Sequence, residues 1–240
     1  MTMKKGYDLS PLEKTLGIVF SDKDTLLCAL THRSYLNENP EFELDHNERL
    51  EFLGDAVLEL IVTDFLYRTY TLPEGEMTNL RSAIVRGEML SKIAGEMGIE
   101  EYLLLSRGES KDTGKARQYI LANAVEAVIG AVYEDQGYDG AKKLVETFVI
   151  SKLSDVVTKG LHIDMKSKFQ ELAQNKFRIT PSYQVLRESG LDHQKEFIVG
   201  VFLHNKKMGE GKGMSKQEAQ QQAATAALAE LEKTMNEDTV

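Results

Sequence analysis

The chain has 240 residues, of which 42% are hydrophobic and 28% charged, a composition typical of a folded globular protein rather than a disordered or membrane-embedded one. Its first residues lack the apolar segment of a secretory signal, and no later run is long enough to span a bilayer. We therefore expect a cytoplasmic protein without membrane contact. The single cysteine, Cys28, excludes an internal disulfide and fits a reducing compartment, and we expect it to be a small buried core residue.

The net charge of −9 would ordinarily argue against a nucleic-acid partner, but it is distributed unevenly along the chain. Residues 1–160 contain 18 basic and 27 acidic residues, a net of −9, whereas residues 161–240 contain 11 of each. Within 161–216 there are 10 basic and 6 acidic residues, a net of +4. The sequence therefore predicts an acidic module joined to a locally basic one.

The first part of the chain carries mostly helical periodicity. We predict helices over six segments: 9–17, 22–30, 46–69, 76–97, 115–136 and 138–157. The tripeptide Pro73-Glu74-Gly75 breaks the chain between the third and the fourth of them. These segments predict an all-helical domain over residues 7–157.

After Lys159-Gly160 the pattern changes to an α+β order. The predicted elements are a helix over 165–177, strands over 182–189, 195–203 and 206–213, and a long Ala-rich helix from Ser215. Short connections predict antiparallel pairing, with both helices packed on one face of the sheet. Small side chains let the last helix pack closely on that sheet: Ala219, Ala223, Ala224, Ala226 and Ala227. The protein is thus predicted to be multidomain, with a second, α-β-β-β-α domain over residues 162–233.

The segment HNERLEFLGDAVLEL, residues 46–60, places acids along one stripe of a predicted helix. The carboxylates that share this stripe within about 80° are Glu48, Glu51, Asp55 and Glu59. The apolar residues assigned to the opposite side are Leu50, Leu53, Val57, Leu60 and Ile61. One interpretation is an ordinary solvated acidic face on a structural helical protein. Against it, the stripe lacks the lysines one turn away that usually relieve carboxylate repulsion, and Phe52 and Leu58 flank it with apolar bulk.

A second helical segment, residues 119–133, is apolar on every side except at Asn123 and Glu126. A helix that is hydrophobic all round is buried, and a buried ionised carboxylate is costly unless it is paired or bound to a metal. Because no cation lies nearby in sequence, we expect this face to meet the acidic stripe with divalent cations between them. Oxygen ligands without His or Cys indicate Mg²⁺ or Mn²⁺ rather than zinc. The alternative is a buried acid and amide satisfied by hydrogen bonds alone.

A carboxylate cluster that holds such an ion is suited to the hydrolysis of phosphodiester bonds. The metal lowers the pKa of a bound water and neutralises charge on the phosphate. It would also explain how an acidic domain tolerates a polyanionic substrate.

The segment NERLEFLGDAVLE, residues 47–59, closely resembles the signature of bacterial ribonuclease III. Other segments resemble that family's remaining blocks, in the same order: LTHRSYLNE (30–38), PEGEMTNLRSAIV (73–85) and ARQYILANAVEAVIGAVYED (116–135). The resemblance implies an all-helical endonuclease domain that forms a homodimer, followed by a double-stranded RNA-binding domain. It also implies hydrolysis of double-stranded RNA in ribosomal or messenger RNA processing, with a divalent metal and no small-molecule cofactor. The implied products carry 5′-phosphate and 3′-hydroxyl ends with a short 3′ overhang.

Residue roles follow from the same resemblance, motif position by motif position. The implied metal ligands are Glu51, Asp55, Asn123 and Glu126. Of these, Asp55 and Glu126 are implied to be catalytic. Glu48 and Glu74 match acids that lie near the RNA path or the edge of the catalytic valley, and His32 and Ser34 match a recurrent pair. For that pair we expect a hydrogen-bonded structural role rather than catalysis.

Asn123 departs from the family pattern, in which this position is usually Asp. An amide oxygen can ligate Mg²⁺ but carries no charge, so the site loses a negative ligand and should bind metal more weakly. The residue is either a natural variant or an engineered change that traps substrate. A further alternative is a catalytically weakened regulator that binds RNA duplexes and seldom cleaves them.

The second domain resembles a double-stranded RNA-binding domain in its first helix, its first loop between strands and the start of its last helix. The implied RNA contacts are Gln170, His193, Lys212, Ser215 and Lys216. Such a domain recognises an A-form duplex by shape, touching 2′-hydroxyls and phosphates. We expect Ser215 to cap the last helix and Lys216 to form an anion site beside its positive end. The family often has a second adjacent lysine where this chain has Gln217, which should lower affinity and salt dependence.

Overall fold

The computed structural model describes residues 7–160, 162–190 and 195–237, with residues 232–237 described by their backbone alone. The chain divides into two compact units, residues 1–162 and 163–240, and each is treated by itself. In the described part of the chain, none of the helices combines the length and the apolar character that crossing a membrane requires.

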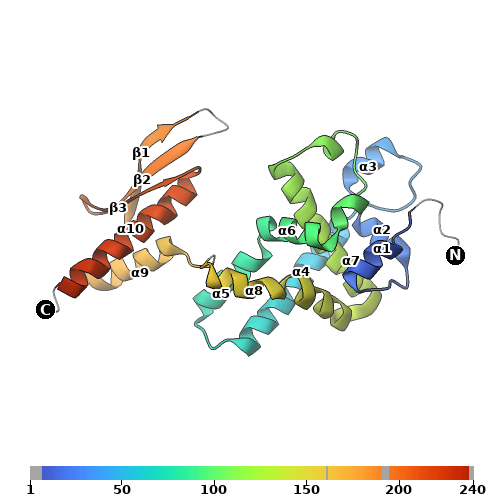
Figure 1. The fold of residues 1–240 in the computed structure, drawn as a ribbon, viewed down its shortest axis with the longest axis horizontal. Helices are drawn as coiled ribbons and strands as arrows, with labels where there is room; N and C mark the ends of the chain where they lie inside the picture. The colour runs from blue at the N-terminus through green and yellow to red at the C-terminus, as the bar shows by residue number, and fades with distance from the viewer. Residues whose placement is uncertain (1–6, 161, 191–194, 238–240) are drawn as a thin grey trace. The chain divides into compact units, whose positions relative to one another are not determined.

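The first unit is helical, as predicted (Figure 1). Its α-helices are α1 (Ser10–Leu16), α2 (Lys23–Ala29), α3 (Arg33–Glu38), α4 (Glu48–Thr69), α5 (Glu74–Val85), α6 (Gly87–Met97), α7 (Lys115–Phe148) and α8 (Leu153–Thr158). Three short 3₁₀ turns accompany them: Ile99–Tyr102, Glu109–Lys111 and Ile150–Lys152.

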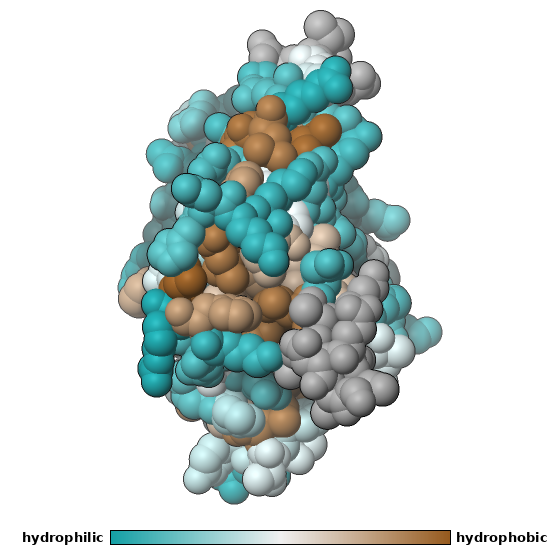
Figure 2. All heavy atoms as spheres, turned by 90° about the vertical axis from the view of Figure 1, so that its left-hand side faces the viewer, coloured by the Kyte–Doolittle hydropathy of each residue, from teal (hydrophilic) through white to brown (hydrophobic). Residues whose placement is uncertain are grey.

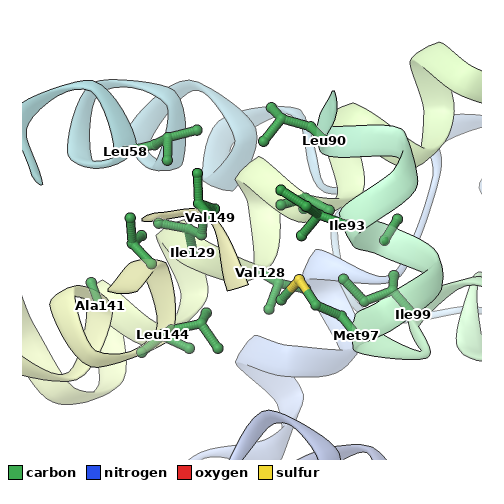
Figure 3. Packing of buried hydrophobic residues seen from close by; sticks show 14 of the residues in the cluster. Leu58, Leu90, Ile93, Met97, Ile99, Val128, Ile129, Ala141, Leu144 and Val149 are labelled. Carbon is green, nitrogen blue, oxygen red and sulfur yellow. The ribbon is translucent and has the colours of Figure 1, made fainter. Parts of the chain in front are cut away.

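The core of this unit forms where α4, α6 and α7 pack together. Figure 3 shows side chains from the three helices pointing toward one another, among them Leu58 of α4, Ile93 of α6 and Val128 of α7. All three are fully buried. Each such side chain stabilises the fold by about 1.5 to 3 kcal/mol relative to an exposed one, so these helices are fixed relative to one another.

Three helix boundaries differ from the prediction. The predicted helix 138–157 ends at Phe148 and is followed by the 3₁₀ turn Ile150–Lys152 and by α8. The predicted helix 76–97 is interrupted at Arg86, whose backbone is extended (φ −62°, ψ 146°) and separates α5 from α6. Leu80, Ala83 and Ile84 before the break and Leu90 and Ile93 after it are all buried, at spacings that suit a single helix. Because the apolar periodicity continues through Arg86, the sequence pattern could not reveal the break.

The predicted boundary at Gly137 is a kink and not an end. Gly137 has a positive φ of 69° inside α7, which continues to Phe148. The bend is tied to the N-terminal helices, because the Asp135 carboxylate accepts hydrogen bonds from the backbone N–H groups of Ser21 (3.0 Å) and Asp22 (3.1 Å). The short helix α3 was not predicted.

Three predicted burials in this unit are wrong. Tyr119, the first residue of the segment expected to be buried on every side, is 67% exposed. Leu60, assigned to the apolar side of its helix, is 57% exposed. Its neighbours Ile61 and Val62 are buried, and Leu60 lies about 100° away from Ile61, beyond the side that α7 covers. Cys28 is half-buried rather than fully buried.

The second unit has the predicted α-β-β-β-α order (Figure 1). Its elements are α9 (Met165–Phe177), β1 (Ser182–Ser189), β2 (Glu196–Leu203), β3 (Lys206–Gly213) and α10 (Lys216–Glu237). The strands form an antiparallel sheet in the order β1-β2-β3. Phe169 of α9, Val201 of β2 and Ala223 of α10 belong to one buried cluster, which places both helices on the same face of the sheet.

The contact between β3 and α10 is so close that the strand positions facing the helix have no room for a side chain. A Cβ added to Gly211 would lie 2.1 Å from the backbone nitrogen of Ala223, and one added to Gly209 would lie 2.5 Å from the carbonyl oxygen of Ala223. The predicted close packing of small residues is confirmed for the alanines that are buried: Ala219, Ala223, Ala224 and Ala227. It is wrong for Ala226, which is exposed.

The surface is mixed in character. Figure 2 shows hydrophobic side chains gathered in patches that are separated by hydrophilic ones. This matches a chain with 42% hydrophobic and 28% charged residues, since folded proteins keep much apolar area at their surface.

Candidate active site

The predicted acidic site forms where α4 and α7 cross with their backbones in contact. A Cβ added to Gly54 of α4 would lie 1.7 Å from the carbonyl oxygen of Glu126, and one added to Gly130 of α7 would lie 2.2 Å from that of Leu50. Only glycine permits so close an approach at either position. Asp55 follows Gly54 directly, so the crossing places its helix turn beside Glu126.

The four predicted metal-binding residues are brought together at this crossing. Burial and the nearby carboxylates of Asp55 and Glu51 together raise the pKa of Glu126 to about 7. Burial also raises the pKa of Glu51, as do Glu48 and Asp55, while a side-chain hydrogen bond from Asn123 lowers it. These mutual effects show that acids from two separate helices share one electrostatic environment.

Among the described residues, the ion pairs of the acidic stripe lie at its outer ends. Glu48 pairs with Arg33 (Oε1 to Nη1, 3.3 Å), and Glu59 lies 4.0 Å from Arg81. By contrast, no lysine, arginine or histidine in the described parts of the chain forms an ion pair with Glu51, Asp55 or Glu126. The inner acids therefore repel one another, with no described positive side chain to compensate them.

The side chains as they stand form no closed metal cage. Among residues that the structure describes, no three His, Cys, Asp and Glu side chains are grouped so that they could hold a metal ion. Glu51, Asp55 and Glu126 supply only carboxylate oxygen, and Asn123 supplies an amide oxygen. The donor set is therefore hard and oxygen-rich, but open.

Glu74 lies elsewhere in the first unit. It is the first residue of α5, and its carboxylate accepts a hydrogen bond from the Thr78 hydroxyl (3.0 Å). It lines a small pocket of about 190 Å³ together with Tyr67 of α4. Tyr67 is about 18 Å along the helix from Asp55 at 1.5 Å per residue, so within one chain Glu74 does not join the acidic site.

His32 and Ser34 have the predicted structural role. The ring of His32 caps α3, with Nδ1 2.8 Å from the Ser34 hydroxyl oxygen and 3.3 Å from the Ser34 backbone nitrogen. The Ser34 hydroxyl in turn accepts a hydrogen bond from the backbone N–H of Ser106 (3.1 Å). The pair fixes a loop against a distant segment.

Phe52 lies beside the acidic stripe and is 82% exposed. An open pocket of about 840 Å³ adjoins it, lined among others by Cys28, His46 and Leu53. Phe52 itself lines this pocket, so exposed apolar surface and open space adjoin the acidic stripe. The sequence showed apolar bulk at this position but not that it is exposed.

In the second unit, the start of α10 is capped as predicted. The Ser215 hydroxyl accepts a hydrogen bond from the backbone N–H of Glu218 (3.1 Å), and the Glu218 carboxylate accepts one from that of Met214 (2.8 Å). This arrangement resembles a capping box, except that Glu218 accepts from Met214, one residue before the capping Ser215. The sequence analysis missed it although Ser and Glu stand three residues apart. The arrangement also places a carboxylate beside the predicted anion site.

The remaining predicted RNA contacts of this unit are mostly exposed. Gln170 lies on the surface of α9. Lys212 pairs with Glu196 (2.7 Å), and the Lys216 ammonium lies 5.6 Å from the centre of the Phe197 ring. His193 lies outside the described residues. The contacts with RNA stay predictions.

The two central glycines were also missed. Gly54 and Gly130 stand inside predicted helices, where glycine is unfavourable relative to alanine. An interior helical glycine indicates a close approach of another backbone, and that signal was available in the sequence.

Comparison with known proteins agrees with both units. The Ribonuclease-III-like family matches residues 22–153, and the Double-stranded RNA binding motif matches residues 165–231. The chain is similar to Ribonuclease 3 of Natranaerobius thermophilus (44% identity, 96% of this chain and 99% of that protein) and of Carboxydothermus hydrogenoformans (45% identity, 92% and 94%). It is also similar to a solved structure of the nuclease domain of ribonuclease III from Campylobacter jejuni, described for structural flexibility in a region involved in dimer formation. That similarity has a TM-score of 0.54 and 36% identity, and covers 60% of this chain and 97% of that one.

A helical nuclease domain followed by a double-stranded RNA-binding domain defines an endoribonuclease that acts on RNA duplexes. Both curated relatives are named Ribonuclease 3, and each is more than 40% identical to this chain over more than nine-tenths of its length. The chain belongs to the ribonuclease III family.

Proposed function

We propose that this endoribonuclease cleaves double-stranded RNA with a divalent cation, Mg²⁺ or Mn²⁺, held by Glu51, Asp55, Asn123 and Glu126. The observation that carries the proposal is the half-buried Glu126, whose pKa is raised to about 7 beside two further carboxylates. Since no described side chain neutralises these acids, a cation from solution is the partner that fits them. Their oxygen donors match the preference of hard divalent ions.

When bound, the ion would activate a water and neutralise charge on the scissile phosphate. The residues of the chain prepare the site for it. The Asn123 side chain lies close enough to Glu51 to lower the pKa of that carboxylate, and its amide oxygen would be a neutral ligand. Glu126, with its pKa near 7, carries a proton part of the time at neutral pH and releases it when a cation arrives.

The proposed enzyme is a homodimer, because one site per chain cuts one strand and two chains are needed to cut both. Phe52, Leu60 and Tyr67 support this assembly. They are 82%, 57% and 75% exposed and lie within about 80° of one another on α4, beside the acidic stripe. A second copy that covers this apolar face would bring its own acids near, and the Campylobacter jejuni domain is described as forming dimers.

The second unit would deliver the duplex to this dimer. The products are proposed to carry 5′-phosphate and 3′-hydroxyl ends with short 3′ overhangs. The proposed substrates are ribosomal or messenger RNA precursors in the cytoplasm. The locally basic stretch 161–216 and its match to a double-stranded RNA binding motif support the substrate class.

Cleavage of a defined RNA duplex by the full chain, with Mg²⁺ and with a chelator, tests the proposal. Short fragments with 5′-phosphate ends should accumulate only with the metal, and Glu126→Gln should stop cleavage while duplex binding is retained. Cleavage that continues unchanged in the chelator would contradict the metal site. Loss of folding in Glu126→Gln is checked by its thermal unfolding.

A second candidate function is a regulator that binds duplexes and rarely cleaves them. The observation that favours it is Asn123, a neutral side chain among three acids that forms a hydrogen bond with one of them. Rapid accumulation of short fragments by the unmodified chain would remove this candidate. A very slow unmodified chain that becomes fast on Asn123→Asp would support it.

A further inference from the structure

Lys166, in the first turn of α9, is held at a junction of three elements in the second unit. Its ammonium donates a hydrogen bond to the side-chain oxygen of Gln220 in α10 (2.9 Å) and lies 5.1 Å from the centre of the Tyr183 ring in β1. A lysine side chain that moved freely in solvent would not make both contacts at once. The position of the positive charge is therefore fixed by the fold.

The backbone around Lys166 is fixed as well. The Asp164 carboxylate caps α9 by accepting hydrogen bonds from the backbone N–H of Lys166 (3.1 Å) and from the side-chain amide of Gln221 (2.8 Å). The Gln221 amide oxygen accepts a second bond from the Lys166 N–H (3.3 Å). The start of α9 and the second turn of α10 are thereby held side by side, which makes the lysine a preorganised group.

The charge of Lys166 is not neutralised by these contacts. Elsewhere in the unit, Lys212 pairs with Glu196 and Lys207 pairs with Glu210. Among the described residues no carboxylate lies within ion-pair distance of the Lys166 ammonium, which bonds to a neutral amide and a neutral ring. An ammonium has three donors, and Gln220 accepts only one, so donors and charge remain for an anion.

The bridge between Lys166 and Gln220 also joins the two surfaces expected to meet RNA. Gln170 lies one turn beyond Lys166 on the same face of α9, and Lys216 lies one turn before Gln220 on the same face of α10. The four side chains form one row across the two helices: Gln170, Lys166, Gln220 and Lys216. Lys166 is the fixed cation in the middle of this row.

We propose that Lys166 binds a backbone phosphate of the RNA duplex, so that a lysine from α9 supplies positive charge where α10 presents glutamines. The inference rests on the proposed function, in that the second unit is taken to bind double-stranded RNA. It assigns to Lys166 a direct contact with the ligand and to Gln220 and Tyr183 the positioning of its ammonium.

The test is the salt dependence of binding, because only a lost phosphate contact changes it. Binding of the full chain to a defined duplex of about 16 base pairs or more is measured in a chelating buffer over about 50 to 200 mM KCl. Lys166→Gln should weaken binding several-fold at low salt and reduce the slope of log affinity against log salt by about 0.9. Lys166→Arg, which keeps the charge, should restore most of the slope.

Lys168→Gln is the matched control. Lys168 is exposed in the same helix but about 200° around it from Lys166, so losing the same charge there should leave the slope nearly unchanged. If Lys166→Gln lowers thermal stability but keeps the unmodified slope, the lysine is only a structural clamp and the inference is overturned. If the unmodified chain itself fails to bind the duplex, the proposed function fails instead.

Discussion

Gly54 and Glu126 are in backbone contact: a Cβ on Gly54 would lie 1.7 Å from the carbonyl oxygen of Glu126. The contact sets the separation between the helix that carries Glu51 and Asp55 and the helix that carries Asn123 and Glu126. The two backbones touch directly, so the geometry of the acidic site depends on the absence of a Cβ at Gly54.

Gly54→Ala should therefore damage both stability and activity. An overlap this short cannot be relieved by a side-chain rotation, so α4 and α7 must separate, at a cost of about 2 to 4 kcal/mol in the free energy of unfolding. Urea denaturation measures that cost. Gly95→Ala in α6 is the control, because a Cβ there meets nothing within 4 Å and should be neutral or slightly stabilising. Equal effects of the two substitutions would contradict the role given to the crossing.

The stability of the metal-free protein should fall as pH rises from about 5 to 8. Burial and the nearby carboxylates together raise the pKa of Glu126 from 4.5 to about 7, so the folded state binds a proton that the unfolded state has lost. This contribution is fully present below the unfolded pKa and is lost as pH rises through about 7. After allowance for the partial exposure of the carboxylate, the loss is about 1 to 2 kcal/mol.

Comparison with Glu126→Gln isolates this effect. The variant cannot ionise at this position. As the pH is raised, the thermal midpoint of the unmodified chain should therefore fall relative to that of the variant. Adding Mg²⁺ at pH 8 should stabilise the unmodified chain more than the variant. A difference between the two midpoints that does not change with pH would show that the carboxylate is not coupled to folding.

Asn123→Asp should tighten metal binding and weaken the metal-free fold. A new carboxylate beside Glu51 and Glu126 adds repulsion when the site is empty and a negative ligand when it is filled. We expect the Mg²⁺ concentration needed for half-maximal stabilisation to fall by about tenfold, which corresponds to about 1.4 kcal/mol. Mg²⁺ titrations followed by thermal unfolding measure it. Asn175→Asp, an exposed position of α9, is the control and should show no such change.

Phe52→Ala should separate the proposed dimer without unfolding the chain. The ring is 82% exposed in the single chain, so its removal costs that chain little. An aromatic anchor inside an interface is worth about 2 kcal/mol or more, about a thirtyfold weaker association. Sedimentation across a dilution series measures it. Val19→Ala, at a site 77% exposed and away from α4, should leave the association constant unchanged. If the unmodified chain sediments as a monomer at every concentration, the proposed dimer is contradicted.

Much of the fold could be predicted because its periodicities are strong. The alternation of residues in β2 and the alanines of α10 led directly to the observed sheet and its covering helix. The break at Arg86 was missed, because the apolar spacing continues through it and Gly87, directly after it, was the one local signal of an interruption. The exposure of Leu60 depends on which side of α4 its neighbours cover, and one helix's own pattern does not contain that information.

The acidic site was predictable in its members but not in its details. Glu126 on an otherwise apolar helix required a partner, and the structure places Asp55 and Glu51 beside it. The ion pairs of Glu48 with Arg33 and of Glu59 with Arg81 join segments that are not neighbours in sequence, so local patterns could not show them. The metal itself and the roles of the ligands stay predictions.

The contact between Gly54 and Glu126 also has a consequence for synthesis of the protein. A nascent chain leaves the ribosome from its N-terminus, so α4 emerges well before α7 has been translated. The Asp135 carboxylate that holds Ser21 and Asp22 arrives equally late. The acids therefore stay apart on the growing polypeptide, and the acidic site can assemble only after the codons for α7 have been read.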